Sequence, residues 1–321
     1  MTERNIDNPA IIALLPRLED VDAGVRRIAL IELADLEDPD GLPWLTDALL
    51  ADVADEVRTE AARLLEAWEE AEVVQALCAA LADPAEPVRL AAAQSLSELK
   101  SLEAGQLILP WVNHAAAFVR TSALRALREL RLEDAAAPAL LALADDDAAV
   151  RREAVGILGW LKHHPALPAL ARLAEGEPDT DVRRAAIGAL GLARDSCVLP
   201  ALVAALNDTA WQVREEAATT LGKVGQAEAG PALVDALADG FWQVRLRAAR
   251  SLGRLRYAAA VDALGELLGH GIANLRKEAA LALGELGQAR ALPMLQAAEA
   301  DSDPEVRKAV RIALAQLRGV A

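Results

Sequence analysis

Aromatic residues are scarce in this chain. They make up 3% of its 321 residues, whereas alanine and leucine are abundant. Strands favour β-branched and aromatic residues, and alanine and leucine are strong helix formers. The composition therefore excludes an all-β fold and favours an all-α one. The chain has only two cysteines, Cys78 and Cys197. They provide neither a disulfide framework nor a metal-binding spacing, so we expect a reducing, cytoplasmic setting and no metal.

Long uncharged runs are also missing. The longest covers residues 104–119, contains Pro110, and is too short to span a bilayer. The first residues, MTERNIDNPA, mix acids and bases and lack the apolar segment of a secretory signal. We therefore expect no membrane association.

An internal repeat dominates the sequence. A Val-Arg or Leu-Arg pair recurs every 31 or 32 residues, and small or apolar residues follow at offsets 4, 5, 8 and 11 from the first member. These offsets lie on one face of a helix. The ten arginines of the pairs are Arg26, Arg58, Arg89, Arg120, Arg151, Arg183, Arg214, Arg245, Arg276 and Arg307.

A second helical pattern precedes each of these helices, as in VLPALVAALND at residues 198–208. Its proline falls where a first helical turn tolerates a missing N–H, at Pro43, Pro168, Pro200, Pro231 and Pro293. Each repeat is thus predicted to be a helix A, a turn and a helix B. Glycines recur on helix B, at Gly159, Gly191, Gly222, Gly253 and Gly284, and leave room for a close neighbouring helix.

Stacked copies of such a hairpin bury a continuous core, which a single copy cannot do. We therefore predict one all-α domain over residues 1–321, an α-solenoid of about ten helical hairpins between residues 8 and 318. Repeat 4, near residues 104–130, departs from the pattern, with Pro110 inside helix A and His114 and Phe118 near the start of helix B. A kinked helix is expected there.

An acidic residue stands six positions before most of the repeated arginines. Such an aspartate can cap helix B or accept a charge-assisted bond from an arginine of its own or the adjacent repeat. We predict a structural ladder between repeats, formed by Asp208, Arg214, Asp239 and Arg245 and their counterparts.

Units of the form A-x-P-x-L…L-x-D-x-x-x-x-V-R-x-x-A-x-x-x-L-G cover nearly the whole chain. They resemble HEAT repeats of the short bacterial type that is also found in phycobilin lyase subunits. The resemblance implies a solenoid that offers its helix-B face, on the concave side, for binding. It says little about function because the matching residues are those that pack.

Catalytic motifs are not apparent. Neither a nucleophile elbow nor a nucleotide-binding glycine motif is present. The four histidines lack ligand spacing, and none is followed by the glutamate typical of the HEAT-like deoxyhypusine hydroxylases. No catalytic, cofactor or metal residue is predicted.

Charge is unevenly distributed along the chain. Residues 1–110 hold 23 acids and 8 bases, whereas residues 111–321 hold 26 acids and 25 bases. The acidic first third disfavours nucleic acid and favours a basic partner.

The outward face of helix B gives candidate partner-binding residues in repeats 5 to 8. Gly156 and Gly188 are expected to form a notch walled by Trp160 and Leu192. Three arginines are expected to project outward beside it and to favour an acidic, partly apolar segment. Trp211 and Trp242, with Phe241, are expected to form an aromatic ridge. The three arginines are Arg247, Arg250 and Arg254.

We interpret the protein as a non-enzymatic scaffold or adaptor that binds another protein. One alternative is a subunit that handles tetrapyrroles like a bilin lyase, because arginines beside an apolar notch suit propionates. A second is a nucleic-acid enzyme resembling the HEAT-like DNA glycosylases, which would need a basic concave surface.

Overall fold

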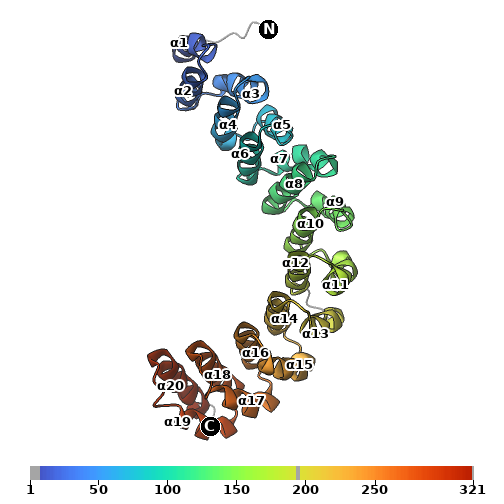
Figure 1. Cartoon of the computed structure of the whole chain (residues 1–321), viewed down its shortest axis with the longest axis vertical. Helices are drawn as coiled ribbons and strands as arrows, with labels where there is room; N and C mark the ends of the chain where they lie inside the picture. The colour runs from blue at the N-terminus through green and yellow to red at the C-terminus, as the bar shows by residue number, and fades with distance from the viewer. Residues whose placement is uncertain (1–7, 193–195, 320–321) are drawn as a thin grey trace. The chain divides into compact units, whose positions relative to one another are not determined.

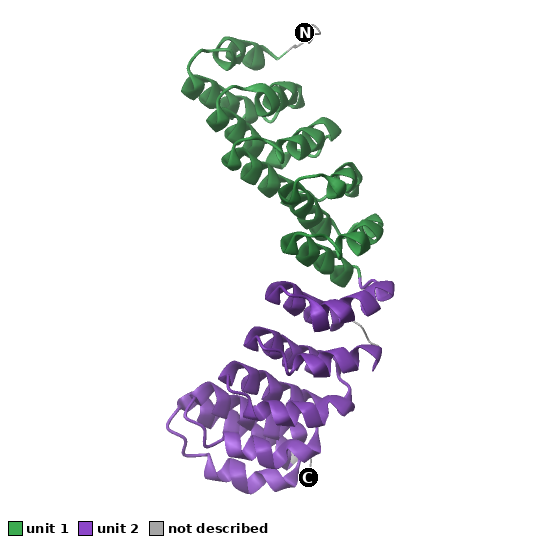
Figure 2. Ribbon diagram, turned by 45° about the vertical axis from the view of Figure 1, so that its right-hand side comes forward, with its two compact units in different colours: residues 1–161 green, residues 162–321 purple. Residues whose placement is uncertain are grey.

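The computed structural model describes residues 8–192 and 196–319. All regular elements within these ranges are helices. The contacts divide the chain into two compact units, unit 1 at Met1–Leu161 and unit 2 at Lys162–Ala321. Each unit holds five consecutive helix pairs over its described residues (Figures 1 and 2). The fold is an α-solenoid, as the repeat predicts.

The first helix of each pair is an A helix and the second is a B helix. The helices of unit 1 are α1 (Pro9–Leu18), α2 (Ala23–Ala34), α3 (Leu42–Ala51), α4 (Asp55–Leu64), α5 (Ala71–Ala80), α6 (Glu86–Ser97), α7 (Leu102–Ile108), α8 (Ala117–Leu130), α9 (Ala136–Ala142) and α10 (Ala148–Trp160). The helices of unit 2 are α11 (Leu167–Gly176), α12 (Thr180–Leu190), α13 (Leu199–Ala205), α14 (Trp211–Val224), α15 (Gly230–Asp235), α16 (Trp242–Leu255), α17 (Val261–Leu267), α18 (Ala273–Leu286), α19 (Leu292–Ala297) and α20 (Pro304–Gly319).

Within each unit the B helices pack on one another in chain order, and each also packs on the A helix of its own pair. The core lies between these two layers. In α14, for example, the side chains at offsets 0, 4, 5 and 8 are fully buried, namely Val213, Ala217, Ala218 and Leu221. The predicted buried face is confirmed at these offsets, while Val224 at offset 11 is only half-buried.

Short 3-10 turns precede most A helices, and the sequence pattern did not reveal them. The turns Pro39–Gly41, His164–Ala166 and Ala289–Ala291 lead directly into α3, α11 and α19. The predicted prolines lie in the first turns of these A helices. In repeat 4 the A helix α7 ends at Ile108, and Pro110 belongs to a 3-10 turn at Leu109–Asn113.

The helix-B glycines of unit 2 allow adjacent B helices to approach closely. A Cβ atom added to Gly284 would lie 2.7 Å from the Cα of Ala313, and one added to Gly253 would lie 2.9 Å from the Cα of Ala282. Real Cβ atoms do not come this near to backbone, so the predicted role of these glycines is confirmed at both positions.

Candidate functional site

A ladder of ion pairs connects successive turns within each unit. Arg214 donates from Nε and Nη2 to the two carboxylate oxygens of Asp239, at 2.6 and 3.0 Å, and from Nη1 to the carbonyl of Asp208, at 2.8 Å. The Asp208 carboxylate in turn accepts from Arg183. Equivalent two-pronged pairs among the described contacts are Arg26–Asp52, Arg58–Asp83, Arg120–Asp145, Arg183–Asp208 and Arg276–Asp301.

The ladder aspartates also shape their own turns. Asp208 Oδ1 accepts from the backbone N–H of Ala210 at 2.7 Å, and Asp239 Oδ1 accepts from that of Phe241 at 2.8 Å. Ala210 and Phe241 are the N-cap residues of α14 and α16. The expectation that these aspartates cap helix B is therefore wrong, because their bonds go to the N-cap residue and not to the first helical turn.

Burial and pairing act in opposite directions on the ladder aspartates. Burial raises the pKa of Asp239, but the hydrogen bonds from Arg214 and from the Phe241 N–H outweigh it and bring the pKa below its usual range. The pKa of Asp208 is lowered against the same burial effect by Arg183 and by the Ala210 N–H. These carboxylates are structural groups that stay charged.

Histidine replaces the aspartate at two ladder positions. Arg245 donates to the carbonyl of Asp239, and its Nη1 lies 3.1 Å from Nε2 of His270. The Nδ1 of the same ring is 3.1 Å from the N–H of Ile272. A neutral imidazole has one nitrogen without a proton, so it accepts only one of these two donors. This rung of the ladder, the Arg245–His270 contact, is therefore weaker than the rungs formed by an arginine and an aspartate.

The other substitution changes the chemistry of the rung in repeat 4. With His114 in place of the aspartate, the guanidinium of Arg89 lies over the Phe118 ring, 5.7 Å from its centroid. His114 itself stacks on Trp111 and accepts the N–H of Ala116 through Nδ1. A cation–π contact thus stands where an ion pair occurs in other repeats.

The arginine cluster expected in repeat 8 is largely paired within unit 2. Arg250 makes two bonds of 2.7 Å to Glu278, which is buried, and Arg247 donates to Glu215 at 2.9 Å. Arg254 is exposed. The projection of these arginines from α16 did not indicate the pairings of Arg247 and Arg250. Burial, followed by the charge of Glu278, raises the pKa of Glu285 on the same surface.

The predicted notch is not open at its first glycine. A Cβ atom at Gly156 would lie 2.9 Å from Cδ of Arg128, so the Arg128 side chain fills this space. Trp160 is 54% exposed and carries Arg131 over its ring at 4.8 Å. These residues belong to unit 1, whereas Gly188 and Leu192 belong to unit 2, where Glu216 Oε1 lies 3.4 Å from a Cβ added to Gly188.

The aromatic ridge pairs different rings from those expected. Trp211 stacks on Phe241, with centroids 5.5 Å apart and planes 14° apart. The guanidinium of Arg214 lies 5.6 Å from the Phe241 centroid. Phe241 is 44% exposed, and Trp242 is half-buried. The stack therefore lies directly on the ladder.

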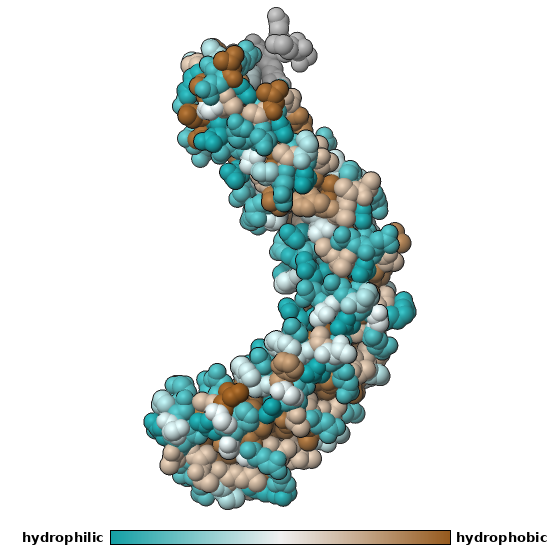
Figure 3. Space-filling model, in the orientation of Figure 1, coloured by the Kyte–Doolittle hydropathy of each residue, from teal (hydrophilic) through white to brown (hydrophobic). Residues whose placement is uncertain are grey.

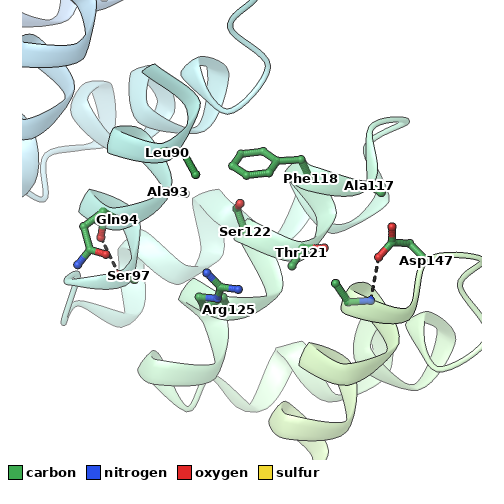
Figure 4. Close-up of a pocket in the computed structure, with 11 residues that line it drawn as sticks. Leu90, Ala93, Gln94, Ser97, Ala117, Phe118, Thr121, Ser122, Arg125 and Asp147 are labelled. Atoms are coloured by element: carbon green, nitrogen blue, oxygen red, sulfur yellow. Dashed lines mark hydrogen bonds between the residues drawn. The ribbon is translucent and has the colours of Figure 1, made fainter. Parts of the chain in front are cut away.

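A hollow on the B-helix surface of unit 1 was not predicted. It has a volume of about 540 Å³ and runs along α6 and α8 toward the start of α10 (Figure 4). Leu90 and Phe118 lie at one end, and Ser97 and Arg125 lie two helical turns further along. The departures at His114 and Phe118 marked this repeat as unusual, but they did not reveal a cavity. The other lining residues are Ala93, Gln94, Ala117, Thr121, Ser122, Asp147 and Ala149.

Arg125 brings positive charge to the polar end of this hollow. Its Nε is 3.3 Å from Oε1 of the buried Glu153, whose Oε2 accepts from Arg128 at 2.7 Å. The Arg125 side chain remains 45% exposed, and its Nη1 and Nη2 make no hydrogen bond within the described part of the chain. Arg152 also approaches Glu153, at 3.9 Å.

Further hydrophobic side chains are exposed at the N-terminal end of unit 1, where small groups of brown atoms lie among teal ones at the top of Figure 3. Ile12 and Ile28 are about half-exposed, and Val21 is fully exposed. Among the described residues, no group of three or more histidine, cysteine, aspartate or glutamate side chains is arranged to hold a metal. In the same part of the chain, no helix combines the length and apolarity that crossing a membrane would require.

Comparison with known sequences identifies the repeat. The HEAT-repeat family matches four overlapping stretches, residues 42–128, 108–191, 170–241 and 230–315. The chain belongs to the HEAT-repeat family. A search of curated proteins finds no match to this HEAT-repeat chain.

Solved structures with a similar fold include both bacterial and eukaryotic proteins. YibA of Escherichia coli is 20% identical with a TM-score of 0.62, over 83% of this chain and 98% of that one. Yeast importin-beta, Kap95p, is 15% identical with a TM-score of 0.65, over 97% of this chain and 50% of its own. Kap121p, bound to the extreme C-terminus of the phosphatase Cdc14p, is 14% identical with a TM-score of 0.69, over 96% of this chain and 41% of its own. The chain thus spans about half or less of the length of these two karyopherins, and its similarity to all three structures is a similarity of fold.

Proposed function

We propose that this HEAT-repeat protein is a non-enzymatic scaffold or adaptor that binds segments of other proteins on its B-helix surface. One observation carries the proposal. The hollow along α6 and α8 places the exposed Leu90 and the half-buried Phe118 beside Arg125, whose Nη atoms are not hydrogen-bonded within the described residues. Large apolar anchors beside an arginine are typical of protein interfaces.

The rigidity of the stack supports the same function. Ladder pairs tie successive turns together, and close glycine contacts tie successive B helices together. A surface fixed in this way loses little conformational entropy when a partner binds. The structure of Kap121p with the C-terminus of Cdc14p is an example of a similar fold in complex with a protein segment.

The finer features of the interpretation remain part of this proposal. The excess of acids in residues 1–110 and the exposed Ile12, Val21 and Ile28 favour a basic, partly apolar partner at the N-terminal end. In unit 2, Arg254 and the Trp211–Phe241 stack are the best-placed contacts for an acidic partner. The two units form one continuous solenoid in our proposal, and the low cysteine content favours the cytoplasm.

The experiment is a selection of displayed random 16-residue peptides on the immobilised full chain. We expect enriched peptides that bind the native chain and not the same chain after heat denaturation. If no peptide is enriched on the native chain over the denatured one, the proposed function is wrong. The selection uses no assumption about which surface binds, so it tests the scaffold function separately from any one site.

A further inference from the structure

The hollow of unit 1 is polar at one end and apolar at the other. The lining residues of α6 run from Leu90 to Ser97, and those of α8 run from Ala117 to Arg125. Phe118 and Arg125, like Leu90 and Ser97, are seven positions apart. Seven residues of α-helix rise about 10 Å. The backbone positions of Phe118 and Arg125 are therefore offset along α8 by about the length of three residues in the polyproline II conformation, which rise about 9 Å and bring side chains i and i+3 to the same face.

The apolar end has a defined origin. Leu90 is 53% exposed on α6, and Phe118 faces it from α8 (Figure 4). Arg89 lies over the Phe118 ring, and the position that pairs with this arginine in other repeats is held by His114. The cation–π contact holds the ring in place beside Leu90. One large apolar side chain of a partner would bury both.

The charges around the polar end favour an anion. Arg125, Arg128 and Arg152 surround one buried carboxylate, Glu153, and Arg128 also pairs with Glu129. Three positive groups thus lie around two negative ones, and a third carboxylate near this end, that of Glu98, accepts from the Gln94 side chain. Asp147 also lines the hollow, but its Oδ1 accepts the backbone N–H groups of Ala149 and Val150 at the start of α10, where the helix dipole offsets its charge.

The charges on the other side fix where the anion can lie. An adjoining hollow of about 480 Å³ between α4 and α6 shares Leu90 and Gln94 with the first. Glu66 and Glu86 line it together with Arg63. Because two carboxylates face one arginine in this second hollow, it disfavours an acidic residue of the partner. A partner segment with a single acidic residue at Arg125 therefore fits better than one with a run of acidic residues.

We propose that this hollow binds a segment of a partner protein in the polyproline II conformation, in which a large apolar residue is followed or preceded, three positions away, by an aspartate or glutamate on the same face. The apolar side chain packs between Leu90 and Phe118, and the carboxylate accepts from Nη1 and Nη2 of Arg125. The inference rests on the proposed scaffold function and names the partner chemistry for one of its surfaces.

The test is a peptide array probed with the full chain. Each peptide has ten residues of glycine and serine, with a variable residue at position 4 (Phe, Leu, Ser or Lys) and another at position 7 (Asp, Asn or Lys), and a second set has the two variable positions exchanged. We expect binding of the Phe/Asp and Leu/Asp peptides and loss of binding when Asn or Lys replaces Asp or when Ser replaces the apolar residue. Preference for Lys over Asp would overturn the proposal.

Affinity of the labelled Phe/Asp peptide is then measured by fluorescence anisotropy with two variants. Arg125→Gln should weaken binding about tenfold or more, because a charge-assisted hydrogen bond is lost. Leu90→Ser should weaken it by a similar factor through lost apolar contact. Glu153 keeps its bond to Arg128 in the first variant, and Leu90 is half-exposed, so both variants should keep the wild-type melting temperature.

Arg63→Gln is the matched control. Arg63 occupies the same position in its repeat as Arg125, two repeats earlier, and lies in the adjoining hollow. Unchanged affinity in this variant is expected. Equal weakening by Arg63→Gln and Arg125→Gln, or no weakening by Arg125→Gln and Leu90→Ser, would overturn the site.

The outcomes separate this site from the proposed function. If no array peptide binds while the random selection yields binders, the site is wrong and the scaffold function stands. If both fail, the function is wrong as well. Binding that persists in 0.5 M salt without loss would also contradict the role of the carboxylate, since exposed charge pairs are screened at that ionic strength.

Discussion

Replacing Asp239 by asparagine tests whether the ladder holds unit 2 together. Asparagine has nearly the same shape and keeps one oxygen that can accept the N–H of Phe241, as Asp239 Oδ1 does at 2.8 Å. The change removes the negative charge and one of the two acceptors that Arg214 contacts at 2.6 and 3.0 Å. The loss is therefore confined to the rung between two successive turns.

The structure sets the size of the effect. The side chains of Arg214 and Asp239 are only 14% and 9% exposed, so water screens the pair poorly. Hydrogen bonds to charged groups contribute about 1.5–3 kcal/mol each, and removing one partner of a fully buried pair costs about 3–5 kcal/mol. Because a neutral acceptor and slight exposure remain here, we expect a loss of about 2 kcal/mol in the free energy of unfolding. For a unit of this size the melting temperature should fall by about 4–8 °C.

Thermal unfolding followed by circular dichroism measures this shift. The matched control is Asp262→Asn, because Asp262 pairs with Arg290 at 2.7 Å but the two side chains are 53% and 72% exposed. Exposed pairs contribute about 0.2–1 kcal/mol, so the melting temperature of the control should fall by less than about 4 °C. A double-mutant cycle with Arg214→Gln should give a coupling energy of about 1–2 kcal/mol. Equal shifts for Asp239→Asn and Asp262→Asn would refute the ladder as a stabilising element.

Three further outcomes follow from the described contacts. The pKa of each ladder aspartate is lower in the folded state than in the unfolded state. Its contribution to the free energy of unfolding is therefore complete above the unfolded pKa near 4 and is lost as the pH falls through the folded pKa. Urea titrations should show wild type losing more stability than Asp239→Asn between pH 5 and pH 3. Burial raises the pKa of Cys78 to about 12, whereas Cys197 is exposed. An aromatic disulfide reagent at pH 8 should therefore label Cys197 in the native chain and label Cys78 only after unfolding. Labelling of both thiols in the native chain would contradict the burial of Cys78. Gly284→Ala should lower the melting temperature because its Cβ would meet Ala313, while Gly176→Ala, which meets nothing within 4 Å, should leave it unchanged or slightly higher.

The repeat architecture could be predicted from the sequence because its determinants are periodic. A spacing of 31 or 32 residues brings equivalent side chains together in adjacent helix pairs, whatever the details of the turns. Arg214 and Asp239 could be assigned to a ladder on this basis, since the arginine of one repeat and the aspartate of the next are 25 positions apart and their turns are neighbours.

The 3-10 turns before the A helices could not be predicted in the same way. They span only three residues each, and their alanine-rich sequences, such as that of Ala258–Ala260, are equally compatible with a longer α-helix.

The candidate surfaces were less predictable because long side chains reach into neighbouring repeats. Arg250 lies on the outward side of α16, but Glu278 on α18 comes within 2.7 Å and compensates its charge. Arg128 fills the space above Gly156 for the same reason. Helical projection assigns each residue to a face and contains no information on how far its side chain extends or on the partner it meets.

The hollow along α6 and α8 shows the complementary case. Leu90 and Phe118 come from different repeats and hold different positions within them, so no column of equivalent residues includes both. They meet in the repeat where histidine replaces the ladder aspartate, at position 114, and where Arg89 lies over the Phe118 ring. A binding surface on a periodic protein is therefore best sought where the period is broken. Restoring the ladder by His114→Asp should draw Arg89 away from the ring and weaken binding of the Phe/Asp peptide, whereas an unchanged affinity would show that the ring is held by other contacts.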